Sequence, residues 1–338
     1  MIRFGILGAA RIAPYALIKP ARLVDGVRVT GIAARDETRA AAFATRWDVP
    51  VVHADYAAVL RDPDVDAVYI PLPNSLHARW TLAAIEAGKH VLCEKPMASN
   101  AAEARRLADA ATVAATGGLV VMEAFHYRYH PLMTRVLGLL ADGAIGAVER
   151  IEVAACIPLP RVRDIRYDLS LSGGAMMDIG CYTVHCVRLL GGAEPVVVAA
   201  EATLRSPGID RAMSASLRFP SGVAARIRCS LWSRKLLDIS IKVTGSAGQL
   251  AVRNFLAPQF PHLLSVRTAP KAGRSRRWVE RVRGESTYAH QLRAFAAAVR
   301  GGDPVLTPAT DAVATMAVID DVYRAAGLPP RGVDSPPR

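Results

Sequence analysis

The first 124 residues alternate short apolar segments with segments of helical periodicity, and this alternation most constrains the fold. Predicted helices separate the apolar segments, which are residues 2–7, 27–34, 67–71, 90–94 and 119–122. Strands and helices that alternate at this spacing predict a parallel, doubly wound sheet. We therefore expect an α/β domain over residues 1–124.

Beyond Glu123 the pattern changes. After a predicted helix at residues 131–142 come closely spaced strands with Pro-Gly and Pro-Ser-Gly turns, which predict a largely antiparallel sheet. One further helix is expected at residues 175–190, and two more close the chain. We expect a second α/β domain over residues 125–328, with an open sheet, and a loose tail over residues 329–338.

The composition is that of a globular protein, with 51% apolar and 21% charged residues. No apolar run reaches the roughly 18 residues that a spanning helix needs, and the N-terminal segment is interpreted as a strand and turn rather than a signal peptide. We therefore expect a soluble cytoplasmic protein without a membrane partner. The five cysteines form no C-x-x-C pair, so we expect reduced thiols and no metal site.

The net charge of +12 raises the question of a nucleic-acid partner. Most of the arginines are spread along the chain. The one dense basic segment, residues 271–283, alternates as a solvated strand face does. We expect no nucleic-acid partner, although a polyanion site in this segment remains the alternative.

The first strand runs into a turn that can hold a dinucleotide. Glycine at such a turn lets the backbone approach a pyrophosphate, whose charge then lies at a helix N-terminus. The expected contacts are Gly8, Ala10, Arg11 and Ile12. Ala10 departs from the glycine pattern, so an ordinary tight turn remains the alternative.

Arg35 and Asp36 follow the second strand. An acidic residue at this position binds the ribose hydroxyl of NAD, whereas an arginine accommodates the 2′-phosphate of NADP. Because Arg35 comes first, we expect NADP, and Asp36 leaves NAD open.

The strand at residues 90–94 ends in Glu94-Lys95-Pro96. Proline cannot donate a hydrogen bond to a sheet, and it keeps the residue before it extended, so Lys95 is expected at the strand tip. Open α/β sheets bind ligands beyond the carboxyl ends of their strands. Only six of the 42 basic residues are lysines, so Lys95 stands out from the general surface charge.

A second group of polar residues follows Gly173-Gly174. On a helix over residues 175–190, Asp178, Tyr182 and His185 share one face because their offsets are four and seven residues. A lysine ammonium close to a phenol lowers its pKa from about 10, which makes Lys95 and Tyr182 a usable acid/base pair. A buried core face at this helical spacing is the alternative.

These motifs resemble the glucose-fructose oxidoreductase/inositol dehydrogenase/MocA (Gfo/Idh/MocA) family. The matching segments are residues 4–8, 71–77, 94–96, 123–131 and 173–182. The resemblance implies a Rossmann domain followed by an open-sheet α/β domain, with the active site between them. It also implies a nicotinamide dinucleotide, a sugar, polyol or diol substrate, and a homodimer or homotetramer that forms through the C-terminal sheet.

The resemblance also assigns roles to residues. Lys95 matches the catalytic lysine, Tyr182 the proton donor and Asp178 the residue that orients the substrate. With the residues above, the cofactor-binding candidates are Gly8, Ala10, Arg11, Ile12, Arg35, Pro71, Asn74, His77, Glu94, Lys95 and Arg128. The substrate-binding candidates are Arg166, Asp178, Tyr182 and His185.

The pair Tyr182 and His185 departs from inositol dehydrogenases, which carry histidine and aspartate at these positions. It points to the dihydrodiol dehydrogenase, D-xylose dehydrogenase and glucose-fructose oxidoreductase side of the family, which tends to use NADP. We predict an NADP-dependent oxidoreductase that acts on a secondary alcohol or carbonyl. A regulatory or scaffold protein that binds NADP without turnover is the alternative.

Overall fold

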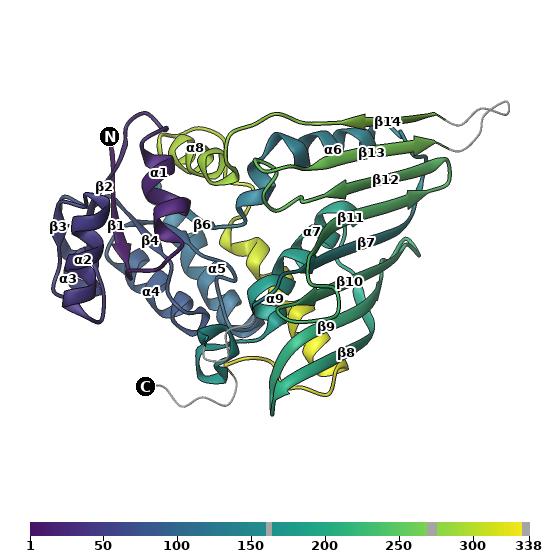
Figure 1. The fold of residues 1–338 in the computed structure, drawn as a ribbon. Helices are drawn as coiled ribbons and strands as arrows, with labels where there is room; N and C mark the ends of the chain where they lie inside the picture. The colour runs from purple at the N-terminus through teal and green to yellow at the C-terminus, as the bar shows by residue number, and fades with distance from the viewer. Residues whose placement is uncertain (160–163, 269–275, 333–338) are drawn as a thin grey trace. The chain divides into compact units, whose positions relative to one another are not determined.

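The computed structural model describes residues 1–159, 164–268 and 276–332 (Figure 1). The chain divides into two compact units. Unit 1 comprises Met1–Tyr129 and Tyr288–Val313, and unit 2 comprises His130–Thr287 and Ala314–Arg338. The division differs from the predicted ranges because it places residues 288–313 with the N-terminal part of the chain.

Unit 1 contains a six-stranded parallel sheet in the order β3-β2-β1-β4-β5-β6, counted over the described residues. This order confirms the doubly wound fold predicted from the sequence. The strands are β1 (Ile2–Leu7), β2 (Val27–Ala33), β3 (Val51–Val52), β4 (Ala67–Ile70), β5 (His90–Cys93) and β6 (Val121–Glu123). The helices between them are α1 (Lys19–Ala21), α2 (Glu37–Trp47), α3 (Tyr56–Arg61), α4 (Asn74–Glu86) and α5 (Ala101–Thr116).

The helix α8 (Thr287–Val299) belongs to unit 1 because its apolar face completes the core of that unit. Phe295 and Phe4 are both fully buried, and their ring centroids lie 5.4 Å apart. Leu292 joins the same apolar cluster, which includes Leu92 of β5. Burying these apolar side chains stabilises the contact between α8 and β1, although the two elements are far apart in the sequence. Sequence spacing alone does not predict this contact.

Unit 2 contains an eight-stranded mixed sheet within the described residues, in the order β14-β13-β12-β11-β7-β10-β9-β8. Only β7 and β10 pair in parallel there, which confirms a largely antiparallel sheet. The strands are β7 (Val148–Cys156), β8 (Val196–Ser206), β9 (Ile209–Arg218), β10 (Ala224–Ser230), β11 (Asp238–Gly245), β12 (Gly248–Arg253), β13 (Leu263–Thr268) and β14 (Arg277–Glu280). The helices α6 (Pro131–Ala141) and α7 (Cys181–Gly191) belong to this unit, and α9 (Ala309–Ala325) runs from one unit into the other.

Three predicted helices differ from the structure. The helix expected after the first turn forms as a π-helical turn, Pro14–Ile18, followed by the short α1, because Pro20 has no N–H for a regular helix. The helix between the segments 67–71 and 90–94, which the sequence predicts to start near residue 78, begins at Asn74 as α4. The helix expected over residues 175–190 consists of a π-helical turn, Met176–Gly180, and then α7.

Two further differences concern the C-terminal half. The prediction of a loose tail is wrong for Arg331, whose side chain is only 1% exposed because it pairs with Asp210. Residues 333–338 lie outside the described residues. Of the basic segment, residues 271–275 also lie outside them, and β14 shows the predicted alternation of more and less exposed residues.

Candidate functional site

The turn after β1 is built around Gly8. This residue has φ +110°, and a Cβ there would lie 2.9 Å from Cδ2 of Leu72, so a larger side chain would be strained and crowded. Ala10 is half-buried and Arg11 is exposed, while Ile12 packs against the core. The backbone conformation therefore fits the glycine position of a phosphate-binding turn.

The residues after β2 differ in whether their side chains bind the protein or face solvent. Asp36 caps α2, because its Oδ1 accepts a hydrogen bond from the N–H of Arg39 at 2.9 Å. The Arg39 side chain donates to the carbonyl of Ala9 at 2.9 Å, whereas Arg35 is exposed. Burial raises the pKa of Tyr56, and the nearby charge of Arg35 opposes that rise. The carboxylate is therefore held at the helix start, while arginine remains exposed beside a tyrosine.

Arg39 and Tyr56 were missed by the sequence analysis. The spacing of Arg35 and Arg39, four residues apart at the start of a helix, is the signal that could have found the second arginine. Nothing in the local sequence places Tyr56, which begins the unpredicted α3, beside this turn.

The carboxyl ends of β4 and β5 bring several predicted residues to one edge of the sheet. Ile70 and Cys93 pair in register, so Pro71 and Glu94 follow at neighbouring strand ends. The hydroxyl of Tyr69 donates to Oε1 of Glu94 at 2.7 Å. Asn74, the first residue of α4, and Lys95 are both half-buried.

The segment after Lys95 is held by buried polar groups. Nδ1 and Nε2 of His77 each lie 2.7 Å from a backbone carbonyl oxygen, that of Pro96 and that of Leu72 respectively. Burial lowers the pKa of His77 to about 4, so the ring is neutral at pH 7 and donates to one of the two carbonyls at a time. The N–H of Met97 donates to Oε1 of Glu123 at 2.8 Å. His77 therefore positions this segment, and its cofactor contact stays a prediction.

Two aromatic residues extend this edge of unit 1. The ring centroids of His126 and Tyr288 lie 4.2 Å apart. A charged residue that follows β5 contributes to the pKa shift of each ring. Burial, helped by the charge of Lys95, lowers the pKa of His126 to about 3. Burial and the charge of Glu94 raise the pKa of Tyr288. Arg128, in the same turn as His126, is half-buried. Tyr288, which the distant α8 contributes, is not among the residues predicted from the sequence.

The first predicted residue of unit 2 is Arg166, in the 3-10 turn Ile165–Tyr167, and it contacts Asp178 of the π-helical turn. Nε of Arg166 donates to Oδ1 of Asp178 at 3.0 Å, and its Nη1 lies 3.1 Å from Oδ1 of Asp164. The charge of Asp178 raises the pKa of Arg166. Arg166 thus binds the carboxylate that was predicted to orient the substrate.

Tyr182 and His185 lie one turn apart in α7, and their exposed fractions are 5% and 4%. Asp178 precedes them in the π-helical turn. The predicted common face of the three side chains therefore spans a π-helical turn and an α-helix, which differ in the number of residues per turn. π-helical turns inside helices are frequent at functional sites. The pairing of Tyr182 with Lys95 stays a prediction.

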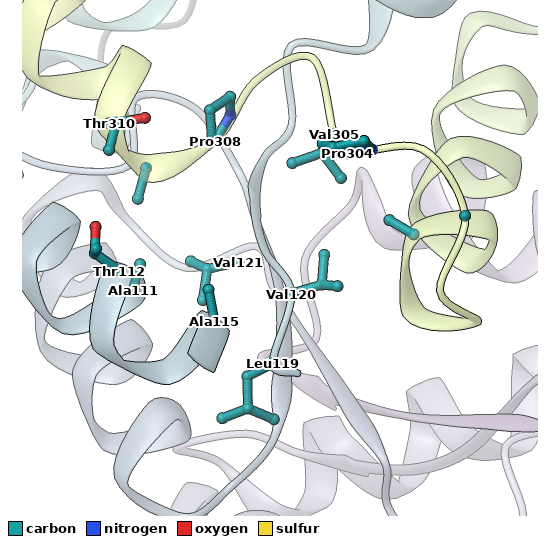
Figure 2. A pocket seen from close by; sticks show the side chains of 13 residues that line it. Ala111, Thr112, Ala115, Leu119, Val120, Val121, Pro304, Val305, Pro308 and Thr310 are labelled. Carbon is teal, nitrogen blue, oxygen red and sulfur yellow. The ribbon is translucent and has the colours of Figure 1, made fainter. Parts of the chain in front are cut away.

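A pocket of about 250 Å³ lies elsewhere in unit 1, and Figure 2 shows its side chains. Residues of α5, β6 and the segment 302–310 line it. Thr112 and Thr310 are the polar side chains in a lining that is otherwise apolar. It contains no residue predicted for the site and no charged group, so we do not assign the chemistry to it.

Several other features bear on the predictions. The five cysteines are buried and free of disulfides. Over residues 1–159, 164–268 and 276–332, no three His, Cys, Asp or Glu side chains are grouped as metal ligands. The helices in these ranges include none with the length and apolarity to cross a membrane.

Models of two protein families match the chain. The model described as "Oxidoreductase family, NAD-binding Rossmann fold" matches residues 2–123, and the model described as "GFO/IDH/MocA C-terminal domain" matches residues 133–251. The two matches begin in unit 1 and unit 2 respectively, so they agree with the division of the chain near Tyr129.

Named relatives are similar over most of the chain. A D-xylose 1-dehydrogenase (NADP(+)) from Haloferax volcanii is 37% identical, over 96% of this chain and 97% of its own. A trans-1,2-dihydrobenzene-1,2-diol dehydrogenase from Mus musculus is 32% identical, over 76% of each. The structure of a 3-ketoreductase from Actinomadura kijaniata in complex with NADP and TDP-benzene superposes with a TM-score of 0.85 at 31% identity, covering 96% of this chain and 97% of that one.

Proposed function

Because the chain belongs to the Gfo/Idh/MocA oxidoreductase family, we propose that it transfers hydride between NADP and a secondary alcohol or carbonyl of a sugar, polyol or cyclic diol. The observation that carries this proposal is the position of Lys95. It lies two residues after Cys93, the buried last residue of β5, at the carboxyl end of a strand in a doubly wound sheet, where such sheets bind their ligands.

The residues after β2 support NADP as the cofactor. Asp36 caps α2 and Arg35 is exposed, so the arginine is the group available for a 2′-phosphate. Guanidinium groups bind phosphate oxygens through paired, charge-assisted hydrogen bonds. The D-xylose dehydrogenase named above is also an NADP enzyme by its name, and the ketoreductase structure contains NADP.

In this proposal Tyr182 is the acid/base. When bound, the nicotinamide supplies or accepts the hydride. The Tyr182 phenol gives a proton to the forming alkoxide in reduction, or takes it from the alcohol in oxidation. The Lys95 ammonium stabilises the phenolate and so lowers the pKa of Tyr182. Such proton transfer is typically worth about 10²- to 10⁴-fold in rate.

Asp178 and Arg166 orient the substrate in the same proposal. A carboxylate accepts hydrogen bonds from neighbouring hydroxyl groups, which sugars, polyols and cyclic diols share. The hydrogen bond of 3.0 Å from Arg166 fixes the orientation of the Asp178 side chain. The proposed substrate class is supported by the polar groups of Asp178 and Arg166 and by the sugar and diol substrates in the relatives' names.

The test is a dehydrogenase assay with a panel of sugars and diols, each with NADP⁺ and with NAD⁺. On the best substrate, Lys95→Ala and Tyr182→Phe are each expected to lower kcat by about 10²-fold or more. Matched controls are Lys19→Ala and Tyr15→Phe, which change an exposed lysine and an exposed tyrosine. Full activity of both site variants would overturn the assignment of these residues.

Cofactor binding separates this proposal from a protein without turnover. Tight NADP binding by calorimetry, with no oxidation or reduction of any substrate class in the panel, would favour a regulatory or scaffold role. Turnover that Tyr182→Phe abolishes while NADP binding stays unchanged would support the proton-transfer role.

A further inference from the structure

A buried ion pair in unit 2 contacts the backbone that precedes Asp178 and Tyr182. Asp210 of β9 is 0% exposed and Arg331 is 1% exposed, and Oδ1 of Asp210 lies 2.7 Å from Nη2 of Arg331. Two charges this deeply buried need excellent geometry and further hydrogen bonds to be tolerated. The partners that provide those bonds show what the pair holds in place.

Both residues bind the backbone that precedes the π-helical turn. Oδ2 of Asp210 accepts a hydrogen bond from the N–H of Met176 at 2.7 Å. Nε of Arg331 donates to the carbonyl of Gly173 at 2.9 Å. The pair therefore grips both ends of the segment 173–176, and its carboxylate lies at a helix start, where negative charge is favourable.

The ion pair also accounts for the second glycine of the Gly-Gly motif. Gly174 has φ +130°, and a Cβ there would overlap Oδ1 of Asp210 and lie 3.0 Å from Nη2 of Arg331. A side chain at this position would push the carboxylate and the guanidinium apart. The glycine is therefore required by the ion pair as well as by its own backbone conformation.

A tyrosine of α9 completes the cluster. The hydroxyl of Tyr323 donates to Oδ1 of Asp210 at 3.0 Å, and the Arg331 guanidinium lies 4.1 Å from the centre of the Tyr323 ring. A guanidinium over an aromatic face is attracted to it, more strongly where water is excluded. The end of α9 and the segment after it are thus fixed to β9.

We propose that Asp210 and Arg331 are positioning residues for the reaction, which hold the segment 173–176 so that Asp178 and Tyr182 take their catalytic orientation. This inference rests on the proposed function. Asp178 follows Met176 by two residues, and Tyr182 follows by six, so a shift of the gripped backbone moves both side chains. A displacement of about 1 Å in a catalytic group can cost about 10²-fold in rate.

The main test variant is the double substitution Asp210→Asn/Arg331→Gln, which removes both charges and leaves no lone buried ion. Its kcat is expected to fall by about 10²-fold while KM changes less than about threefold and NADP affinity, a property of unit 1, is unchanged. The single variant Arg331→Lys keeps the positive charge, so its kcat is expected to lie between that of the double variant and that of the unmodified protein. The control is Arg324→Gln, because Arg324 is 58% exposed and pairs with Asp321 on the surface of the same C-terminal region.

Hydrogen exchange gives a readout that does not depend on turnover. The amides of residues 174–182 are expected to exchange faster in the double variant, and those of β1 and β5 to exchange as in the unmodified protein. Unchanged exchange at residues 174–182 together with unchanged kcat would overturn the positioning role of Asp210 and Arg331. An equal loss of protection in both units would also overturn it, since that would mean general destabilisation. If the unmodified protein turns over no substrate, the proposed function fails, while the exchange result still tests whether Asp210 and Arg331 hold the segment 173–176.

Discussion

At the scale of single residues, the choice between NADP and NAD depends on which side chains after β2 already bind other groups of the protein. Asp36 looks like a ribose-binding carboxylate in the sequence, but it caps α2. Arg35 remains exposed beside it. The sequence leaves both residues as candidates for the ribose end of the cofactor, and the structure shows that Asp36 caps α2.

Arg35→Ala is expected to raise KM for NADP⁺ about 10- to 100-fold, because it removes charge-assisted hydrogen bonds to the 2′-phosphate. KM for NAD⁺ should change less than about threefold. Initial rates with each cofactor at saturating substrate measure both values. The control Arg46→Ala removes an exposed arginine from the far end of α2. An equal loss with both cofactors would contradict the assignment of Arg35.

His126 should make the stability of unit 1 depend on pH. Its pKa is lowered to about 3, against about 6.5 in an unfolded chain, so below pH 6.5 the unfolded state binds the extra proton. Lowering the pH from 7 to 5 is therefore expected to cost about 2 kcal/mol through this residue. Thermal unfolding at the two pH values should show a smaller loss for His126→Phe, which keeps a ring against Tyr288. The same loss in both proteins would refute this prediction.

At the scale of elements, the sequence predicted the β-α alternation of unit 1 well because its strands are short, apolar and separated by good helix formers. It predicted the helix after Gly174 less well. Residues 175–187 are almost all buried, so their hydrophobic pattern has no polar face to show where a π-helical turn gives way to an α-helix. The Gly-Gly motif was recognised, yet its partner Arg331 lies in a segment whose composition resembles a loose tail.

At the scale of the whole molecule, long-range burial decides which segments belong together. The chain leaves unit 1 at Tyr129 and re-enters it at Tyr288, and the core contact of Phe295 with Phe4 is the physical reason. No local pattern encodes such a return. The sequence therefore predicts the two kinds of sheet, but not that unit 1 is assembled from two separate stretches of chain.

The sheet of unit 2 also carries exposed apolar side chains that a single copy leaves in water. Val196 and Val198 of β8 are 63% and 59% exposed, and Val279 of β14 is 49% exposed. Val196 and Val198 lie close together at the start of β8, where the register shifts between Val197 and Ala199. Apolar surface of this kind marks an interface when it is contiguous, and we propose that the sheet pairs with a second copy of the chain.

Light scattering after size exclusion should therefore give at least twice the chain mass of 36.1 kDa. The double variant Val196→Lys/Val198→Lys places two like charges in that interface, where they cannot be solvated, and is expected to shift the protein to the monomer mass. Val113→Lys is the matched control, because Val113 is 71% exposed on α5 of unit 1. A monomer mass for the unmodified protein would exclude pairing, and an oligomer that survives the double variant would place the interface away from β8.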